Sequence, residues 1–122
     1  MNASARGIAL VGTFLSLSAV FLAALGAHLI NMNGLADIWQ TASMVHMFNA
    51  AALIGLAALL GVRDSGILKW GAWLIAMGTA LFCGSIYMHV ISGQLVSGVA
   101  PAGGLLMISG WSLAVLAFLR KT

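Results

Sequence analysis

The sequence predicts an all-α integral membrane protein: one domain, residues 1–122, that folds as a bundle of four transmembrane helices. Hydrophobic residues make up 62% of the 122 positions and charged residues only 6%, whereas a soluble domain carries charges on about a quarter of its positions. The mean hydropathy is +1.11. Four apolar runs follow one another, each long enough for the ~20 residues that a helix needs to cross a bilayer.

The first two predicted helices cover about residues 7–30 and 41–62. A polar start with Arg6 precedes the first helix, and residues 31–40 contain Asn, Gly and Asp, which favour a loop. A basic start before an apolar run also resembles a cleavable signal. The run is longer than a usual signal core and more membrane-type sequence follows, which favours a retained span.

The third and fourth predicted helices cover about residues 67–91 and 99–119. The short charged turn at 63–66 makes the second and third helices antiparallel neighbours. In the third helix Gly71, Gly78 and Ser85 recur at heptad spacing, and such a smooth stripe lets another helix approach closely in lipid. Pro101 suits the first turn of the fourth helix, where its missing N–H costs nothing. The residues assigned to helix packing are Gly26, Gly71, Gly78, Gly84, Pro101, Gly103, Gly104, Gly110 and Trp111.

The distribution of charge predicts the orientation in the membrane. With four spans, all five basic residues fall on the side of the two termini, and the opposite side carries only Asp37. Lysine and arginine remain on the cytoplasmic side of membranes, so both termini are expected in the cytoplasm, or in the matrix of an organelle. The basic residues are Arg6, Arg63, Lys69, Arg120 and Lys121. They form no stripe, which argues against a nucleic-acid partner.

Polar side chains gather in the half of the predicted bundle away from the basic residues. These candidates for a ligand pocket are His28, His46, Asn49, Ser85, Tyr87 and His89. Intramembrane ionisable groups are candidates for function, but His and Asn also link helices by hydrogen bonds. The structural role is favoured. A pocket for a small molecule or quinone, or a metal or haem site with His28, His46 and His89 as weak candidates, stays open. No cofactor is predicted.

The sequence contains no recognisable arrangement of catalytic groups. No paired carboxylates or phosphate-binding glycine loop is present, and the only acids, Asp37 and Asp64, fall on opposite membrane faces. The sequence therefore favours a non-enzymatic protein: an accessory, scaffold or assembly partner that acts through the small-residue faces of the first, third and fourth helices. The alternative is a ligand-binding membrane protein that holds a quinone, lipid or metal. The expected partners are the lipid bilayer and either a larger membrane complex or a second copy of the chain.

Several motifs occur in an order typical of one family. They are "ALGAHL" (24–29), "WQT" (39–41) with "GLA" (55–57), "LFCGSIY" (81–87), and "APAGG" (100–104) with "SGW" (109–111). Over nearly the whole chain these resemble the small bacterial inner-membrane family catalogued as domain of unknown function number 423, whose eukaryotic relatives are called transmembrane protein 256. The resemblance implies a four-helix protein of the bacterial inner membrane, and no activity.

The resemblance also implies which positions are typical of the family. These are Gly26, His28, Gly84, Ser85, Tyr87, Pro101, Gly103, Gly104 and Trp111. Where family members usually carry Tyr and His in the second helix, this chain has Val45 and Asn49, with His46 next to the valine; Ala100 replaces a usual Thr. A site that uses the family's second-helix histidine is therefore altered or absent in this chain, and His28 with Tyr87 is the pair that the resemblance carries over.

Overall fold

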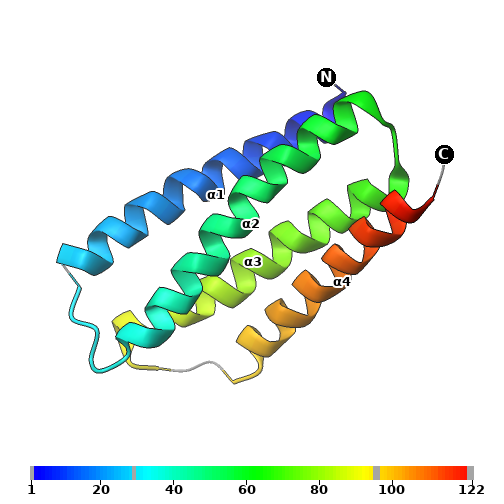
Figure 1. Ribbon diagram of the computed structural model, residues 1–122. Helices are drawn as coiled ribbons and strands as arrows, with labels where there is room; N and C mark the ends of the chain where they lie inside the picture. Colours follow the sequence, from blue (N-terminus) through cyan, green and yellow to red (C-terminus); the bar gives the residue numbers. More distant parts are fainter. Residues whose placement is uncertain (1, 29, 95–96, 121–122) are drawn as a thin grey trace.

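The computed structural model describes residues 2–28, 30–94 and 97–120, and these form four helices (Figure 1). The helices are α1 (Ala3–His28), α2 (Ala36–Val62), α3 (Gly66–Ser92) and α4 (Val99–Leu119). Each is long and apolar enough to cross a membrane. The prediction of an all-α bundle with four spanning helices is confirmed.

Two helices begin earlier than the apolar runs indicate. The helix α1 begins at Ala3 rather than near residue 7, because the side-chain oxygen of Asn2 accepts a hydrogen bond from the Ala5 amide at 2.7 Å and caps the first turn. The helix α2 begins at Ala36 rather than near residue 41, after a turn at Asn33 and Gly34 with positive φ of 53° and 78°. Asp37 then lies in the first turn, where a negative charge is favourable. The loop expected over residues 31–40 is correspondingly shorter.

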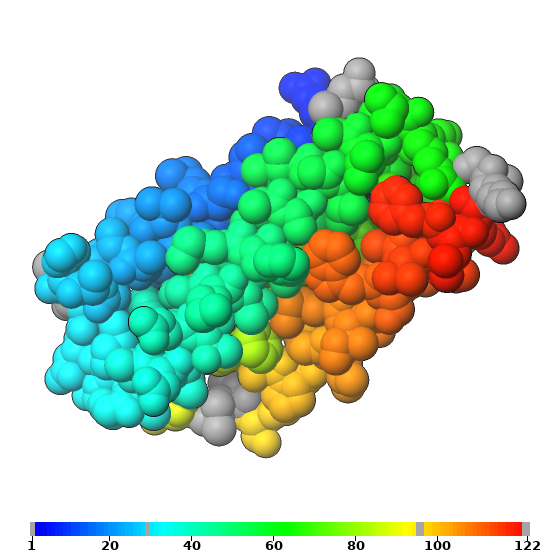
Figure 2. Space-filling view, viewed as in Figure 1, coloured from blue at the N-terminus to red at the C-terminus, as the bar shows by residue number. Residues whose placement is uncertain are grey.

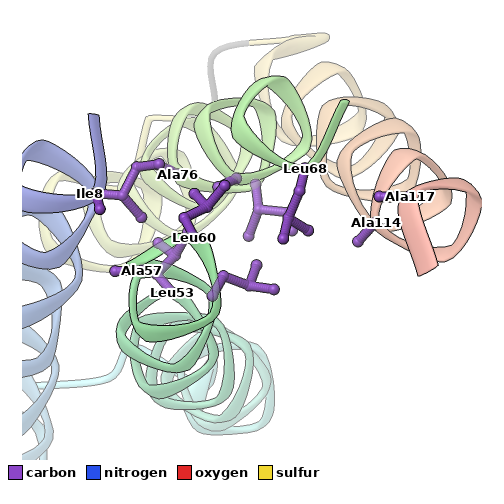
Figure 3. Packing of buried hydrophobic residues seen from close by; sticks show 12 residues of the cluster. Ile8, Leu53, Ala57, Leu60, Leu68, Ala76, Ala114 and Ala117 are labelled. Carbon is purple, nitrogen blue, oxygen red and sulfur yellow. The ribbon is translucent and has the colours of Figure 1, made fainter. Parts of the chain in front are cut away.

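The helices run up and down, so both termini lie at the same end of the molecule (Figure 1). The pair α2 and α3 forms the centre; α1 packs mainly on α2, and α4 packs on α3. Seen end on in Figure 3, α1 and α4 lie on opposite sides of this pair. Over the described ranges α1 and α4 do not touch, so the bundle is open along that edge.

Two apolar clusters fill the interior. The larger one lies toward the end with the termini and joins all four helices through side chains such as Ile8, Leu53, Leu60, Leu68 and Ala114 (Figure 3). The smaller one lies toward the opposite end and consists of Trp39, Ala42, Cys83, Tyr87 and Val90. The buried polar residues of α2 and α3 lie between and beside these clusters.

The basic residues share one end of the bundle. Arg6 follows the start of α1, Arg63 follows α2, Lys69 opens α3 and Arg120 follows α4, whereas Asp37 lies at the other end. Lys121, which the sequence predicts at this same end, lies outside the described residues. Arg63 Nη2 donates to the carbonyl oxygens of Ala117 and Arg120, both at 2.8 Å, so this side chain also satisfies carbonyls that the end of α4 leaves free.

Candidate functional site

His46 lies at the centre of a hydrogen-bond chain that joins three helices. Its ring is buried, with 4% of its surface exposed. Nε2 lies 3.1 Å from the hydroxyl of Ser18 on α1, and Nδ1 lies 3.0 Å from the hydroxyl of Tyr87 on α3. Both ring nitrogens are therefore occupied by side chains of neighbouring helices.

The contacts of the Ser18 hydroxyl favour one tautomer of His46. Ser18 donates its proton to the carbonyl oxygen of Leu15 at 3.0 Å, so its oxygen accepts from Nε2–H of His46. The ring is neutral, because a buried cation without a counter-ion is costly in lipid and both acids of the chain are exposed near helix ends. Nδ1 is then unprotonated and accepts the proton of Tyr87.

Tyr87 is held by aromatic contacts as well. Its ring packs against Trp39 of α2 with centroids 4.7 Å apart, and against the ring of His46 at 5.7 Å. The hydroxyl of Ser43 lies near the phenol oxygen, yet it forms no hydrogen bond of acceptable geometry within the part of the chain that the structure describes.

Asn49 forms a second interhelical centre one turn further along α2. Its Nδ2 donates to Thr79 of α3 at 3.0 Å and to the sulfur of Met107 of α4 at 3.0 Å. Its Oδ1 accepts from the indole nitrogen of Trp111 on α4 at 3.1 Å. The indole can only donate, which fixes the orientation of the amide. Thr79 passes its own proton to the carbonyl of Ile75 at 2.7 Å, so every member of this network is bonded.

The remaining pocket candidates lie apart from these two centres. His28 is exposed at the end of α1, and Ser85 donates to the carbonyl oxygen of Phe82 in its own helix at 2.9 Å. His89 is partly buried near the end of α3, and its Nδ1 has no partner among the described residues. The six candidates therefore form no common pocket. Across residues 2–28, 30–94 and 97–120, no three His, Cys, Asp or Glu side chains converge in a metal-binding group.

The glycines divide into those that meet a neighbouring helix and those that face open space. Gly71 and Gly78 of α3 lie against Gly110 and Gly103 of α4: a Cβ would lie 2.8 Å from Gly110 O at position 71 and 2.6 Å from Gly103 O at position 78. Gly26 lies against the indole of Trp39. Added Cβ atoms at Gly84 and Gly104 would meet nothing within 4 Å in the described structure.

The two remaining packing candidates, Pro101 and Trp111, belong to α4. Pro101 is exposed in the first turn of α4. Trp111 donates a hydrogen bond to Asn49, and its ring lies at a tilt against that of Phe48 with centroids 5.9 Å apart.

Three hollows adjoin these residues. A groove of about 710 Å³ separates α2 from α4 and is lined by Phe48, Asn49, Gly104, Met107 and Trp111, among others. A cavity of about 490 Å³ lies between the end of α1 and the beginning of α2, beside Trp39 and Ser43. A cavity of about 150 Å³ adjoins His46 and Tyr87.

Residues 22–104 match a family described as "Protein of unknown function (DUF423)". The chain belongs to this family. The match confirms the resemblance predicted from the sequence motifs.

Relatives within the family carry names that refer to membranes. The UPF0382 inner membrane protein YgdD of Escherichia coli is 34% identical over 105 residues, which cover 83% of this chain and 80% of that protein. The UPF0382 membrane protein SAB0533 of Staphylococcus aureus is 30% identical over 112 residues, which cover 88% and 91%. No solved structure matches the chain. With four apolar helices of spanning length, this DUF423 chain is a multi-pass membrane protein.

Val45 and Asn49, the two positions at which α2 departs from the residues usual in the family, lie in different surroundings in this DUF423 chain. Asn49 joins α2 to both α3 and α4. Val45 packs beside the smaller apolar cluster and lines the groove between α2 and α4. The position that the resemblance associates with a family histidine thus takes part in bonds between helices.

Three residues with hydroxyl side chains at or beside these centres were not among the sequence candidates: Ser18, Ser43 and Thr79. Each is a hydroxyl within an apolar run, and that is the signal that could have found them, because polar side chains in membrane helices commonly face the bundle interior. Their partners could not be read from the sequence, since the rotation of each helix about its axis decides which hydroxyl meets which ring.

Proposed function

We propose that this protein is a non-enzymatic accessory or assembly partner that packs a helix face against another membrane-embedded protein. The observation that carries the proposal is the groove of about 710 Å³ between α2 and α4, which is apolar and flanked by the exposed side chains Met44, Phe48, Ile108 and Val115. Figure 2 shows α2 and α4 side by side on one face of the molecule. We place the protein in the bacterial inner membrane, where the name of its Escherichia coli relative places that protein.

The polar side chains support a role without chemistry. His46, Asn49 and Tyr87 use their hydrogen-bonding groups on one another and on Ser18, Thr79 and Trp111. Such bonds between helices stabilise a bundle in lipid, where hydrophobicity does not drive helix association. The alternative of a quinone, lipid or metal held by the six sequence candidates has less support, because those residues are divided among separate places.

The partner surface differs from the one expected from the small-residue stripes. Gly71, Gly78, Gly103 and Gly110 face one another between α3 and α4, so these glycines are used within the bundle. The face formed by α2 and α4 is the surface that remains for a partner. Its groove follows α4 from residue 104 to residue 115, about 16 Å of helix, so side chains of a partner helix crossing this face could insert into it.

Photo-crosslinking in membranes tests the proposal. A photoreactive amino acid replaces Ile108 beside the groove, or Leu17, which is exposed on α1. We expect a discrete crosslinked polypeptide, either another protein or a second copy of this chain, from position 108 and none from position 17. Gly104→Leu, which fills the groove, removes the crosslink, whereas Gly55→Leu, at an exposed glycine of α2, leaves it. A chain that elutes alone in mild detergent and gives no crosslink at position 108 contradicts the proposal.

A further inference from the structure

The cavity of about 490 Å³ between α1 and α2 has the properties of a binding site. Its volume is within the range of ~300–1,000 Å³ that is typical of small-molecule sites. It lies at the end of the bundle opposite the basic residues, where α1 ends and α2 begins. The lining includes apolar side chains at Ala23, Ala27, Met32 and Met47, together with Trp39 and Ser43.

Three buried polar atoms lack a hydrogen-bond partner among the described residues, the Ser43 hydroxyl, His89 Nδ1 and Arg63 Nε, and of these residues Ser43 lines this cavity. Only 7% of its surface is exposed, and its hydroxyl has no hydrogen-bond partner among the described residues. The neighbouring buried groups of His46, Asn49 and Thr79 are all bonded. An unpaired buried hydroxyl destabilises the fold, and such groups are rare in native structures unless something else pairs with them.

Trp39 brings a second hydrogen-bond donor to the same cavity. It is 5% exposed, and its ring packs at a tilt of 58° against the ring of Tyr87, which restricts its orientation. Its indole nitrogen lies beside Gly26, where a Cβ would collide with it, so glycine at this position lets the edge of the ring pack closely against α1. The indole nitrogen makes no hydrogen bond to the residues that the structure describes. Because an indole only donates, its partner has to supply an acceptor oxygen.

We propose that this cavity binds the carbonyl oxygen of a membrane-soluble amphiphile, which accepts hydrogen bonds from Ser43 and Trp39. The apolar body of the ligand lies against the methionines and alanines of the lining. Trp39 is in the first turns of α2, near the membrane interface where tryptophans concentrate. Two sources offer this chemistry at that depth: the ester carbonyl of a phospholipid and the ring carbonyl of a quinone.

The indole resonance of Trp39 reports on this contact directly. Protein labelled with ¹⁵N-tryptophan gives one indole signal for each of its four tryptophans, and Trp39→Phe identifies the one of interest. Spectra are compared in nanodiscs of diether phosphatidylcholine, which has no carbonyl group, and of diester phosphatidylcholine. Menadione, a quinone without a long tail, is then titrated into the diether nanodiscs.

We expect the Trp39 signal to move in at least one arm. A difference between diether and diester lipid identifies the phospholipid as the source, and a saturable shift with menadione identifies the quinone. Ser43→Val halves the lipid-dependent shift or weakens menadione binding about fivefold, which is the loss of about one hydrogen bond. The matched variant Ser112→Val changes neither, since Ser112 is exposed and donates only to Ile108 of its own helix.

Two results would overturn the proposal. One is a Trp39 signal that is unchanged in both arms. The other is a shift that persists at full size in Ser43→Val while the other three indole signals show that the variant is folded. Ser43→Ala, which adds no bulk, repeats the measurement if valine is not accommodated.

Discussion

Asn49 and His46 each connect α2 to side chains of two other helices. Every hydrogen-bond donor of these two side chains has a partner. Asn49 gives both amide protons and its oxygen to α3 and α4. His46 does the same with its two ring nitrogens toward α1 and α3. Together the two residues hold all four helices, so single substitutions at these positions report on the bundle as a whole.

Asn49→Ala is expected to destabilise the bundle by about 1–3 kcal/mol. A hydrogen bond between membrane helices is worth about 0.6 kcal/mol on average and up to about 1.7, and this change removes three contacts and strands the indole N–H of Trp111. Unfolding by SDS in mixed micelles measures the loss. Ser112→Ala serves as the control, because its hydroxyl is bonded only within α4. Equal stability of the two variants would contradict the assignment of Asn49 as a helix link.

A second prediction for a single residue concerns which ring nitrogen of His46 carries the proton. The proton is expected on Nε2, with Nδ1 accepting from Tyr87, because Ser18 already donates elsewhere. The ¹⁵N shifts of the labelled imidazole distinguish the two nitrogens directly. Tyr87→Phe is expected to move the Nδ1 shift and to leave the proton on Nε2. A wild-type ring protonated on Nδ1, or on both nitrogens at neutral pH, would refute this order of donors and acceptors from Tyr87 through His46 to Ser18.

Packing between α3 and α4 depends on matched glycines rather than on large side chains. Gly71 faces Gly110, and Gly78 faces Gly103, so the two backbones approach closely at two levels seven residues apart. Where backbones approach this closely, dispersion and weak hydrogen bonds act over a large area, and helices associate in lipid without a hydrophobic driving force. The heptad spacing in α3 indicated such an interface, although Ser85 at the third level bonds within its own helix.

Gly78→Ala is expected to cost about 1–3 kcal/mol, the usual range for overpacking. The new methyl group would lie 2.6 Å from the carbonyl oxygen of Gly103 and 2.7 Å from the amide of Met107, and backbone atoms cannot move aside easily. Gly84→Ala in the same helix meets no atom within 4 Å in the described structure. It should therefore keep or raise stability by up to about 1 kcal/mol. Thermal unfolding in detergent compares the two variants, and a Gly84→Ala variant as unstable as Gly78→Ala would argue against the α3–α4 contact.

The end of α4 depends on a side chain from another part of the chain. Arg63→Ala is expected to increase hydrogen exchange in the last turn of α4 at least about threefold, because Arg63 donates to two carbonyls there and its guanidinium lies 5.7 Å from the Phe118 ring. Arg63→Lys keeps the charge but not the planar fork, so it should give an intermediate rate. Lys69→Ala removes a charge from the same end and should leave the rate unchanged.

At the scale of the whole molecule, hydropathy predicts the number of helices and their order, because length and apolar composition suffice to identify spans. The pairing of side chains could not be predicted. His28 and Tyr87, which the resemblance carries over as a pair, are not joined: His28 is exposed, and Tyr87 binds His46. Apolar faces in a membrane protein give little information on rotation about the helix axis, since the lipid and the interior are both apolar. That rotation decides which polar groups meet.

Orientation in the membrane is a property of the whole molecule, and the charge distribution predicts it. Four described basic residues share the end of the bundle where α1 begins and α4 ends, and Asp37 lies at the other end, so that basic end is expected in the cytoplasm. In a Cys83→Ser background, single cysteines replace the exposed Gln94 in the α3–α4 loop or the exposed Asp64 in the α2–α3 turn. A membrane-impermeant maleimide should label position 94 in intact cells and position 64 only after the cells are opened. Labelling of position 64 from outside would reverse the topology and would place the Trp39 cavity, which lies at the end opposite the basic residues, on the cytoplasmic side.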